Sequence, residues 1–394
     1  MNIAIDVRCL IDKQLTGVGE YTFNLLSQLF SIDKQNQYYL FYNSYKKNQL
    51  ATPESRRWRD GGGPKFIGDN VHYCNFNFPN KLLNVLILLF KLPKLDRLIN
   101  KKFNVKVDFF FFPNINFIAT ACPYIITAHD LTFVFLKKCF SPKSRAWHWL
   151  INARQTFQRA KKIIAVSENT KRDLTKIYNI PEQQITTIYS GIAPVFQPNL
   201  QETPTAKRIK NKYQLPQKFI LYLGTIEPRK NIATLISAFE LFKKSATHKN
   251  YSLVLAGKHG WRFDKINKQI RKSPFRDMIK LVDYVSPEDK PYLYNLAEMF
   301  VYPSLYEGFG FPVLEAMACG KPVITSHASS LPEICESAAT YIDPNNINDL
   351  VAALTALAGN DQQQRHLINS GLSQAAKFSW QSAAQQLLNI FNKL

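Results

Sequence analysis

Two glutamates beside a glycine-rich stretch are the acidic side chains whose spacing most suggests chemistry. Glu307 precedes Gly308, Phe309 and Gly310, and Glu315 follows in the first turns of an expected helix. Backbone amides of such a loop, together with a helix N-terminus, suit a diphosphate or sugar hydroxyls. A carboxylate accepts two hydrogen bonds from a vicinal diol such as a ribose, whereas it repels a phosphate. The pair therefore predicts recognition of sugar hydroxyls; the plainer interpretation is a solvated loop acid and a helix-dipole acid.

Two adjacent cations, Arg229 and Lys230, follow the expected strand Phe219–Leu223. Paired cations at that place could neutralise a diphosphate and stabilise it as a leaving group while negative charge develops on it. The simpler alternative is a run of charge that faces solvent. The sequence has no D-x-D and no His/Cys spacing typical of a metal site. We therefore predict no metal, and expect protein cations to act where a divalent metal otherwise would.

A second group of candidates lies in the first half of the chain. His129 and Asp130 end the expected strand Tyr124–Ala128, at the edge where open α/β sheets bind ligands. Gly17 and Gly19 follow the first strand and precede a helical pattern, as the phosphate loop of a dinucleotide-binding domain does. The G-x-G spacing also fits a tight turn, and a lone histidine at a strand end also fits a structural role.

The elements that must position these side chains form a repeating pattern. Short apolar runs, among them residues 185–189, 252–256, 279–285 and 299–302, alternate with longer helical patterns, which indicates buried parallel sheets covered by helices. The pattern restarts near residue 219, after a proline-rich linker of residues 194–217. We predict an α/β protein of two doubly wound domains, residues 1–198 and 199–375, with a last helix in residues 376–394 that packs back on the first domain. Gly61-Gly62-Gly63-Pro64 is expected to be a loop.

The segment around Glu307, YPSLYEGFGFPVLEAMACGKPVI, resembles the hallmark of the retaining group 1 (family 4) nucleotide-sugar glycosyltransferases of GT-B fold. Other segments are similar to that family in the same order: TGVGEYTFNLL from Thr16, ITAHDLTF from Ile126, IIAVSENTKRDL from Ile163, YLGTIEPRKNI from Tyr222 and SSLPEI from Ser329. The resemblance covers essentially the whole chain. It implies two Rossmann-like domains that face a central cleft, with the acceptor bound by the first domain and the nucleotide sugar by the second.

The resemblance also implies roles for the candidates in the second domain. Lys230 would hold the donor diphosphate. Many members also carry an arginine directly after the strand-end glycine. This chain has Thr225 at that position, so Arg229 would serve in place of that arginine. Glu307 would hold hydroxyls of the donor sugar with help from the amides of residues 308–310, and Glu315 would bind the ribose.

The remaining implied roles are less specific. Val285 would contact the base through its backbone, and Gly17 and Gly19 would approach the donor. His129 would assist catalysis or position the transferred sugar. Asp130 would orient His129, cap the next helix or face the acceptor.

The implied reaction is the transfer of a hexose from a nucleoside diphosphate to a hydroxyl with retention of configuration. No carboxylate pair suggests a double displacement, so the resemblance implies attack from the same face, with the leaving diphosphate taking the acceptor proton. GDP-mannose is the first donor expected, and a glycan or lipid-linked acceptor of cell-surface polysaccharide synthesis is the expected partner. No cofactor beyond the donor is expected. A UDP-sugar transferase, a nucleotide-sugar epimerase and a non-catalytic nucleotide-sugar binder stay open as alternatives.

The charge of the chain points to an anionic partner. Fifty Lys and Arg against 29 Asp and Glu give +21. The basic residues are scattered and no recognition module is apparent, so a nucleic-acid-binding protein is not expected. The stretch from Lys81 to Lys102 combines six basic residues with many leucines and is divided by Pro93, which suits an anionic membrane surface or a packed helix with a solvated basic face. We expect a cytoplasmic protein with reduced thiols, peripheral at the inner face of the plasma membrane.

Overall fold

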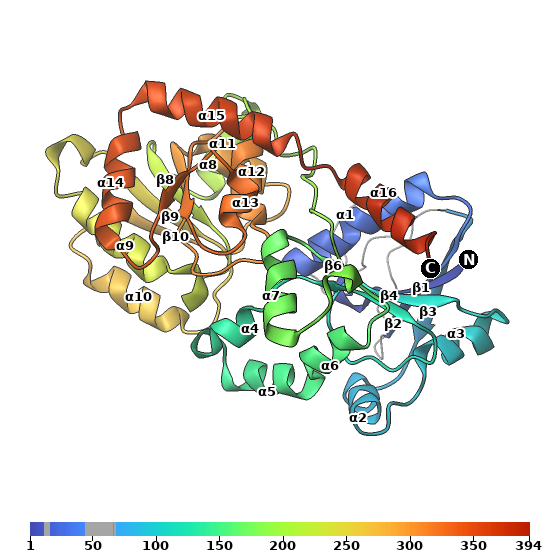
Figure 1. Cartoon of the computed structure of the whole chain (residues 1–394). Helices are drawn as coiled ribbons and strands as arrows, with labels where there is room; N and C mark the ends of the chain where they lie inside the picture. Colours follow the sequence, from blue (N-terminus) through green and yellow to red (C-terminus); the bar gives the residue numbers. More distant parts are fainter. Residues whose placement is uncertain (12–15, 44–65, 67) are drawn as a thin grey trace. The chain divides into compact units, whose positions relative to one another are not determined.

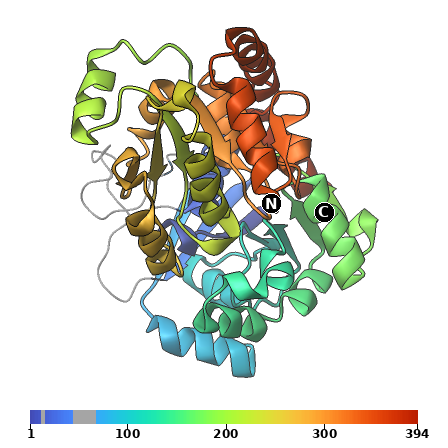
Figure 2. The same cartoon turned by 90° about the vertical axis from the view of Figure 1, so that its left-hand side faces the viewer.

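The computed structural model describes residues 1–11, 16–43, 66 and 68–394, which form two units (Figures 1 and 2). Unit 1 comprises Met1–Leu131, Pro142–Gly191 and Ser379–Leu394, and unit 2 comprises Thr132–Ser141 and Ile192–Phe378. The domain boundaries expected from the sequence, 1–198, 199–375 and 376–394, stay a prediction. The expected loop at Gly61-Gly62-Gly63-Pro64 lies outside the described residues.

Unit 1 is built on a parallel sheet of seven strands in the order β3-β2-β1-β4-β5-β6-β7. The central strand β4 is Phe109–Phe112, four consecutive phenylalanines that are all buried because helices cover both faces of the sheet. The other strands are β1 (Asn2–Asp6), β2 (Gln37–Asn43), β3 (Val71–Phe76), β5 (Tyr124–Ala128), β6 (Lys162–Ala165) and β7 (Ile185–Thr187).

The helices of unit 1 come from both ends of the chain. Its last helix, α16 (Trp380–Phe391), packs against its first, α1 (Gly17–Ile32), and Phe391 contacts Phe109 and Phe111 of β4 with ring centroids 5.1 and 5.6 Å apart. The chain end thus completes the core of unit 1. The remaining helices are α2 (Asn80–Phe90), α3 (Leu95–Phe103), α5 (Pro142–Ile151), α6 (Ala153–Gln158) and α7 (Glu168–Tyr178).

Unit 2 repeats the architecture with six parallel strands in the order β10-β9-β8-β11-β12-β13. Its strands are β8 (Phe219–Leu223), β9 (Ser252–Ala256), β10 (Ile279–Val282), β11 (Met299–Tyr302), β12 (Val323–Ser326) and β13 (Thr340–Ile342). Its helices are α4 (Thr132–Phe135), α8 (Pro204–Lys212), α9 (Ile232–Phe242), α10 (Phe263–Lys272), α11 (Lys290–Leu296), α12 (Phe311–Ala318), α13 (Leu331–Cys335), α14 (Ile347–Leu357) and α15 (Asp361–Ala375).

Both sheets are doubly wound, so strand order reverses once in each. The reversal lies between β1 and β4 in unit 1 and between β8 and β11 in unit 2. At such a point the loops after the two neighbouring strands diverge and leave room for a ligand at the carboxyl edge of the sheet. The loops that follow β8 and β11 carry Arg229, Lys230 and Glu307, which places these side chains at the reversal point of unit 2.

Candidate functional site

Arg229, Lys230 and Glu307 meet in one charged cluster within unit 2. Lys230 Nζ lies 2.5 Å from Glu307 Oε1, and Arg229 Nη1 lies 3.1 Å from Glu307 Oε2. Arg229 Nε also pairs with Glu227 at 2.6 Å. The cluster therefore combines two cations with two carboxylates and is close to neutral before any ligand binds.

Two hydroxyl groups form hydrogen bonds with the charged cluster. Ser304 Oγ donates to Glu307 Oε1 at 2.6 Å, and Lys230 Nζ donates to the phenol of Tyr302 at 2.5 Å. The backbone N–H of Leu305 donates to the carbonyl of Arg229, which ties the two loops together. Lys230 and Glu307 are both buried, so each depends on these partners to offset its lost hydration.

The loop after β11 keeps its shape through two serines and a glycine. The backbone N–H of Glu307 donates to Ser329 Oγ at 2.8 Å, and Ser330 Oγ donates to the carbonyls of Glu307 and Phe309. Gly310 has φ 116°, and a Cβ there would lie 2.9 Å from the side chain of a leucine at the start of α13. Glycine is thus required where the loop turns into α12.

The charge states follow from these contacts. Lys230, Arg229 and the Ser304 hydroxyl outweigh the effect of burial and lower the pKa of Glu307 from 4.5 to about 2. Glu307 is therefore an anion at neutral pH. Burial and the neighbouring Arg229 lower the pKa of Lys230, because both disfavour its positive charge. Burial raises the pKa of Tyr302, so its phenol stays neutral beside Lys230.

Glu315 lies in α12 with different neighbours. It is buried, and Oε2 accepts a hydrogen bond from the phenol of Tyr294 on α11 at 2.7 Å. Lys290, one turn earlier on α11, places Nζ 3.9 Å from Glu315 Oε1. One face of α11 therefore orients this carboxylate, mainly through a neutral donor.

In unit 1, His129 follows β5 and lies against α1. Its Nε2 is 2.8 Å from the carbonyl of Pro113, which can only accept, so Nε2 carries a proton and Nδ1 is the basic nitrogen of the neutral ring. Burial lowers the pKa of His129 and favours this neutral form. The ring of Tyr21 contacts it edge-on at 4.8 Å. Tyr21 thus joins His129 to the helix that Gly17 and Gly19 open.

The other candidates fall in different places. Gly17 begins α1 with its backbone exposed, and no side chain caps the helix at Thr16. Asp130 follows His129 in unit 1. Val285 is buried beyond β10, the edge strand next to β9, and is not part of the charged cluster. The structure thus brings Arg229, Lys230 and Glu307 together, while the roles of the remaining candidates stay predictions.

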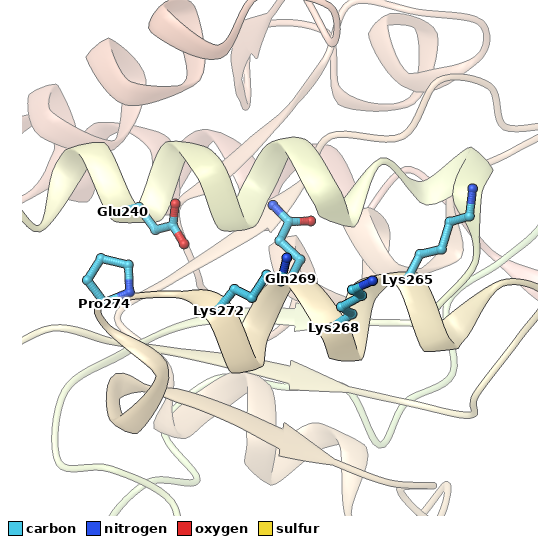
Figure 3. Close-up of a pocket in the computed structure, with 6 residues that line it drawn as sticks. All are labelled: Glu240, Lys265, Lys268, Gln269, Lys272 and Pro274. Carbon is cyan, nitrogen blue, oxygen red and sulfur yellow. The ribbon is translucent and has the colours of Figure 1, made fainter.

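Two hollows in unit 2 lie away from these residues. Figure 3 shows one of about 430 Å³ between α9 and α10, lined by Glu240, Lys265, Lys268, Gln269, Lys272 and Pro274. A second, of about 500 Å³, includes residues that precede β11 and β12, at the opposite edge of the sheet from the charged cluster. Neither is lined by a side chain predicted to do chemistry.

Sequence reasoning missed the side chains that hold the charged ones. Ser304 and Tyr302 lie within the quoted hallmark segment, and Ser329 and Ser330 begin the segment SSLPEI, but none was given a role. Nothing in the sequence indicated a role for Tyr294, because it is a tyrosine in an ordinary helical pattern. A count of the hydrogen bonds that a buried carboxylate needs would have pointed to the serines.

Two known families together match most of the chain. Residues 16–195 match the family Glycosyltransferase Family 4, and residues 205–374 match Glycosyl transferases group 1. The chain belongs to the group 1, family 4 glycosyltransferases. O-antigen chain mannosyltransferase B of Escherichia coli is 34% identical over 271 residues, which are 68% of this chain and 70% of that protein. Serotype-specific mannosyltransferase WbdA of Escherichia coli is 30% identical over 272 residues; they are 68% of this chain but 33% of WbdA.

Solved structures show the same fold. A sucrose-phosphate synthase from Thermosynechococcus elongatus has a TM-score of 0.77 at 18% identity, covering 100% of this chain and 98% of its own. Anabaena Alr3699/HepE in complex with UDP-glucose has a TM-score of 0.71 at 17% identity, with both chains fully covered. The predicted family and the GT-B fold with two parallel sheets are confirmed, and the protein is an enzyme of a retaining hexosyltransferase family. No helix among the described residues is long and apolar enough to cross a membrane.

Proposed function

We propose that the enzyme transfers mannose from GDP-mannose to a hydroxyl of a glycan acceptor, with retention of configuration, during cell-surface polysaccharide synthesis. The observation that carries this proposal is the cluster of Arg229, Lys230 and Glu307 in a chain 34% identical to an O-antigen mannosyltransferase. Two adjacent cations suit the two phosphates of a nucleoside diphosphate, and an ionised carboxylate beside them suits sugar hydroxyls.

The roles of the side chains follow from their surroundings. Lys230 and Arg229 bind the diphosphate and stabilise the negative charge that grows on it as the glycosidic bond breaks. The leaving diphosphate accepts the proton of the attacking hydroxyl, so no separate protein base is required. Glu307 and the amides of residues 308–310 bind the sugar, and Glu315 binds the ribose.

Residues outside the cluster complete the proposed reaction. His129 is neutral, with Nδ1 as its basic nitrogen, and assists the transfer of the sugar. Asp130 faces the acceptor. Gly17, Gly19 and the backbone of Val285 contribute to donor binding. The acceptor is attached to a lipid, and the chemistry needs no metal ion.

The first experiment is thermal unfolding of the purified chain with GDP, UDP and ADP, each with and without its sugars and with EDTA present. A ligand that binds the folded state raises the melting temperature by mass action. A shift selective for GDP and GDP-mannose supports the mannosyl proposal. A shift selective for UDP or its sugars would replace it with a glucosyl, galactosyl or N-acetylhexosaminyl transfer.

Transfer itself is tested with radiolabelled donor and isolated acceptor glycan. Lys230→Ala and Glu307→Ala should each reduce transfer strongly, while their matched controls in the hollow of Figure 3, Lys265→Ala and Glu240→Ala, should not. Donor binding without any transfer in the wild type, across mannose, glucose and galactose acceptors, would favour a non-catalytic nucleotide-sugar binder. Product release without acceptor would favour an epimerase.

A further inference from the structure

One face of α2 presents large apolar side chains to solvent. Leu82, Val85, Leu89 and Phe90 recur with helical spacing, and their side chains are between 48% and 65% exposed. Soluble proteins rarely expose a contiguous apolar patch of this kind unless it meets a partner. The outer face of α2 is therefore a candidate interaction surface.

The packing of α2 in unit 1 does not account for this face. Only Leu83 and Ile87, one turn apart, are buried. The next residue after the helix with a large apolar side chain, Leu92, is also half exposed. Figures 1 and 2 both show α2 at the border of unit 1, apart from the sheet. The core thus uses a narrow stripe of α2 and leaves the wider apolar face outside.

Cations flank the apolar face at both ends. Lys81 lies at the start of α2 and Lys91 directly after it; both are exposed, and Lys94 follows. No Asp or Glu occurs in residues 80–94. An apolar face with cations at its rim complements a surface whose interior is hydrocarbon and whose headgroups are anionic.

Helix α5 offers a second apolar and basic surface on the same unit. Trp149 is 79% exposed, and Trp147 and Leu150 are exposed beside it. Lys143 and Arg145 on α5 are exposed as well, and α5 contains no acid. Both views place α5 along the same lower border of unit 1 as α2. Tryptophan suits the boundary between headgroups and hydrocarbon, since one edge of its ring is polar.

We propose that the exposed faces of α2 and α5 form a docking surface for an anionic lipid bilayer. The proposal locates on α2 the membrane contact that the sequence suggested for residues 81–102, and adds α5 to it. Lys102 of α3 donates to the carbonyl of Asn75 and lies 5.1 Å from the ring of Phe76, so its ammonium group already has partners within the protein.

A second copy of the chain is a poorer occupant of this surface. In a two-fold contact between two α2 faces, the lysines at the rim of one copy would approach those of the other, and like charges at an interface are costly. An anionic bilayer offers the opposite charge at the same rim.

The test is sedimentation of the full chain with vesicles of phosphatidylcholine alone and of equal parts phosphatidylcholine and phosphatidylglycerol. Wild type should bind the anionic vesicles, less so at high salt. Lys81→Gln with Lys91→Gln should weaken binding by about fivefold per lysine. Leu89→Ser with Phe90→Ser should weaken it by at least about tenfold, since two side chains no longer enter the bilayer.

Matched controls lie in unit 2. Val195→Ser removes an apolar side chain that is 56% exposed, and Lys207→Gln with Lys265→Gln removes two charges; both should bind vesicles as wild type does. The fluorescence of Trp149 should shift to the blue with anionic vesicles, and Trp149→Phe should remove that part of the signal.

Several results would overturn the proposal. They are equal binding to neutral and anionic vesicles, wild-type binding by Leu89→Ser with Phe90→Ser, or a dimer in light scattering that this variant dissociates while vesicle binding persists. Each variant is also melted with the nucleotide that stabilises the wild type. A retained shift shows that the nucleotide site is intact, so a failure of docking is distinguishable from a failure of the proposed function.

Discussion

Removal of the negative charge of Glu307 should strengthen the binding of a nucleoside diphosphate while it abolishes sugar transfer. In the ligand-free enzyme, Glu307 and Glu227 already neutralise Arg229 and Lys230. A diphosphate must compete with these carboxylates for the same cations. Glu307→Gln removes the more buried competitor and keeps the size of the side chain, so the cations should attract the diphosphate more strongly.

The pKa of Glu307 sets the scale of the effect. Arg229, Lys230 and the Ser304 hydroxyl lower this pKa from 4.5 to about 2 against the opposing effect of burial, a net preference for the anion of about 3 kcal/mol. A displaced carboxylate keeps part of its attraction to the cations, and the hydrogen bond from Ser304 also contributes to the decrease, so only a part of this free energy becomes available to the diphosphate. We expect a gain of about tenfold for the nucleoside diphosphate. The nucleotide sugar should gain less, since it also loses its contact with Glu307.

Isothermal titration calorimetry measures the effect directly. Lys230, left beside Arg229 without a buried carboxylate, should have its pKa lowered further, so part of the gain should appear as proton uptake on binding. Titrations in two buffers of different ionisation enthalpy reveal that uptake. Glu315→Gln is the matched control: Glu315 pairs with Tyr294 and Lys290, and this variant should bind the nucleoside diphosphate more weakly because it loses the proposed contact with the ribose. Unchanged or weaker binding by a folded Glu307→Gln would refute the reasoning.

Three further predictions concern the same unit. Tyr294→Phe removes the phenol that orients Glu315, so it should raise the KM for the donor about fivefold with little change in kcat. It should also reduce discrimination against a donor that contains 2′-deoxyribose. An unchanged ratio of the KM values for the ribose and 2′-deoxyribose donors would contradict this prediction. Gly310→Ala should destabilise the fold by about 1–3 kcal/mol in urea unfolding, whereas Gly17→Ala, with open space around its Cβ, should not. The lowered pKa of Glu307 contributes stability above about pH 4.5 that is lost as the pH falls toward 2, so wild type should lose more stability than Glu307→Gln over that range.

The central strands were predictable because they are apolar on both faces. The runs 252–256 and 299–302 expected from the sequence coincide with β9 and β11. Two of the expected runs extend beyond strands that lie at a sheet edge. The run expected at 279–285 continues past the end of β10 at Val282, and the run expected at 185–189 continues past the end of β7 at Thr187. An edge strand has hydrogen-bond partners on one side alone, so an apolar run there need not stay paired along its whole length.

Helix boundaries were predictable where the backbone imposes them. Pro312 lies in the first turn of α12, and the last helix, expected within residues 376–394, is Trp380–Phe391. Pro93 separates α2 from α3 as the sequence suggested. Ser167 caps the start of α7, where its side chain accepts a hydrogen bond from the N–H of Thr170.

The sequence predicted which charged side chains belong to the site, but it did not predict that they form ion pairs with one another. Arg229, Lys230 and Glu307 were each expected to bind the donor, as though they were separate contacts. Their mutual ion pairs depend on the reversal of strand order between β8 and β11, which brings together loops that are distant in sequence. A pattern of residue types reports what each side chain could bind; it does not report what satisfies that side chain before the ligand arrives.

The two glutamates of the hallmark therefore differ in a way that their spacing conceals. Glu307 pairs with two cations and accepts a hydrogen bond from a hydroxyl. Its negative charge is therefore neutralised until a ligand draws those cations away. Glu315 accepts a hydrogen bond from the phenol of Tyr294, and its pair with Lys290 at 3.9 Å is longer than either pair of Glu307. A neutral diol therefore meets weaker competition for the second carboxylate than for the first. A diphosphate sugar must rearrange the first, which makes Glu307 the carboxylate whose removal should separate nucleotide affinity from catalysis.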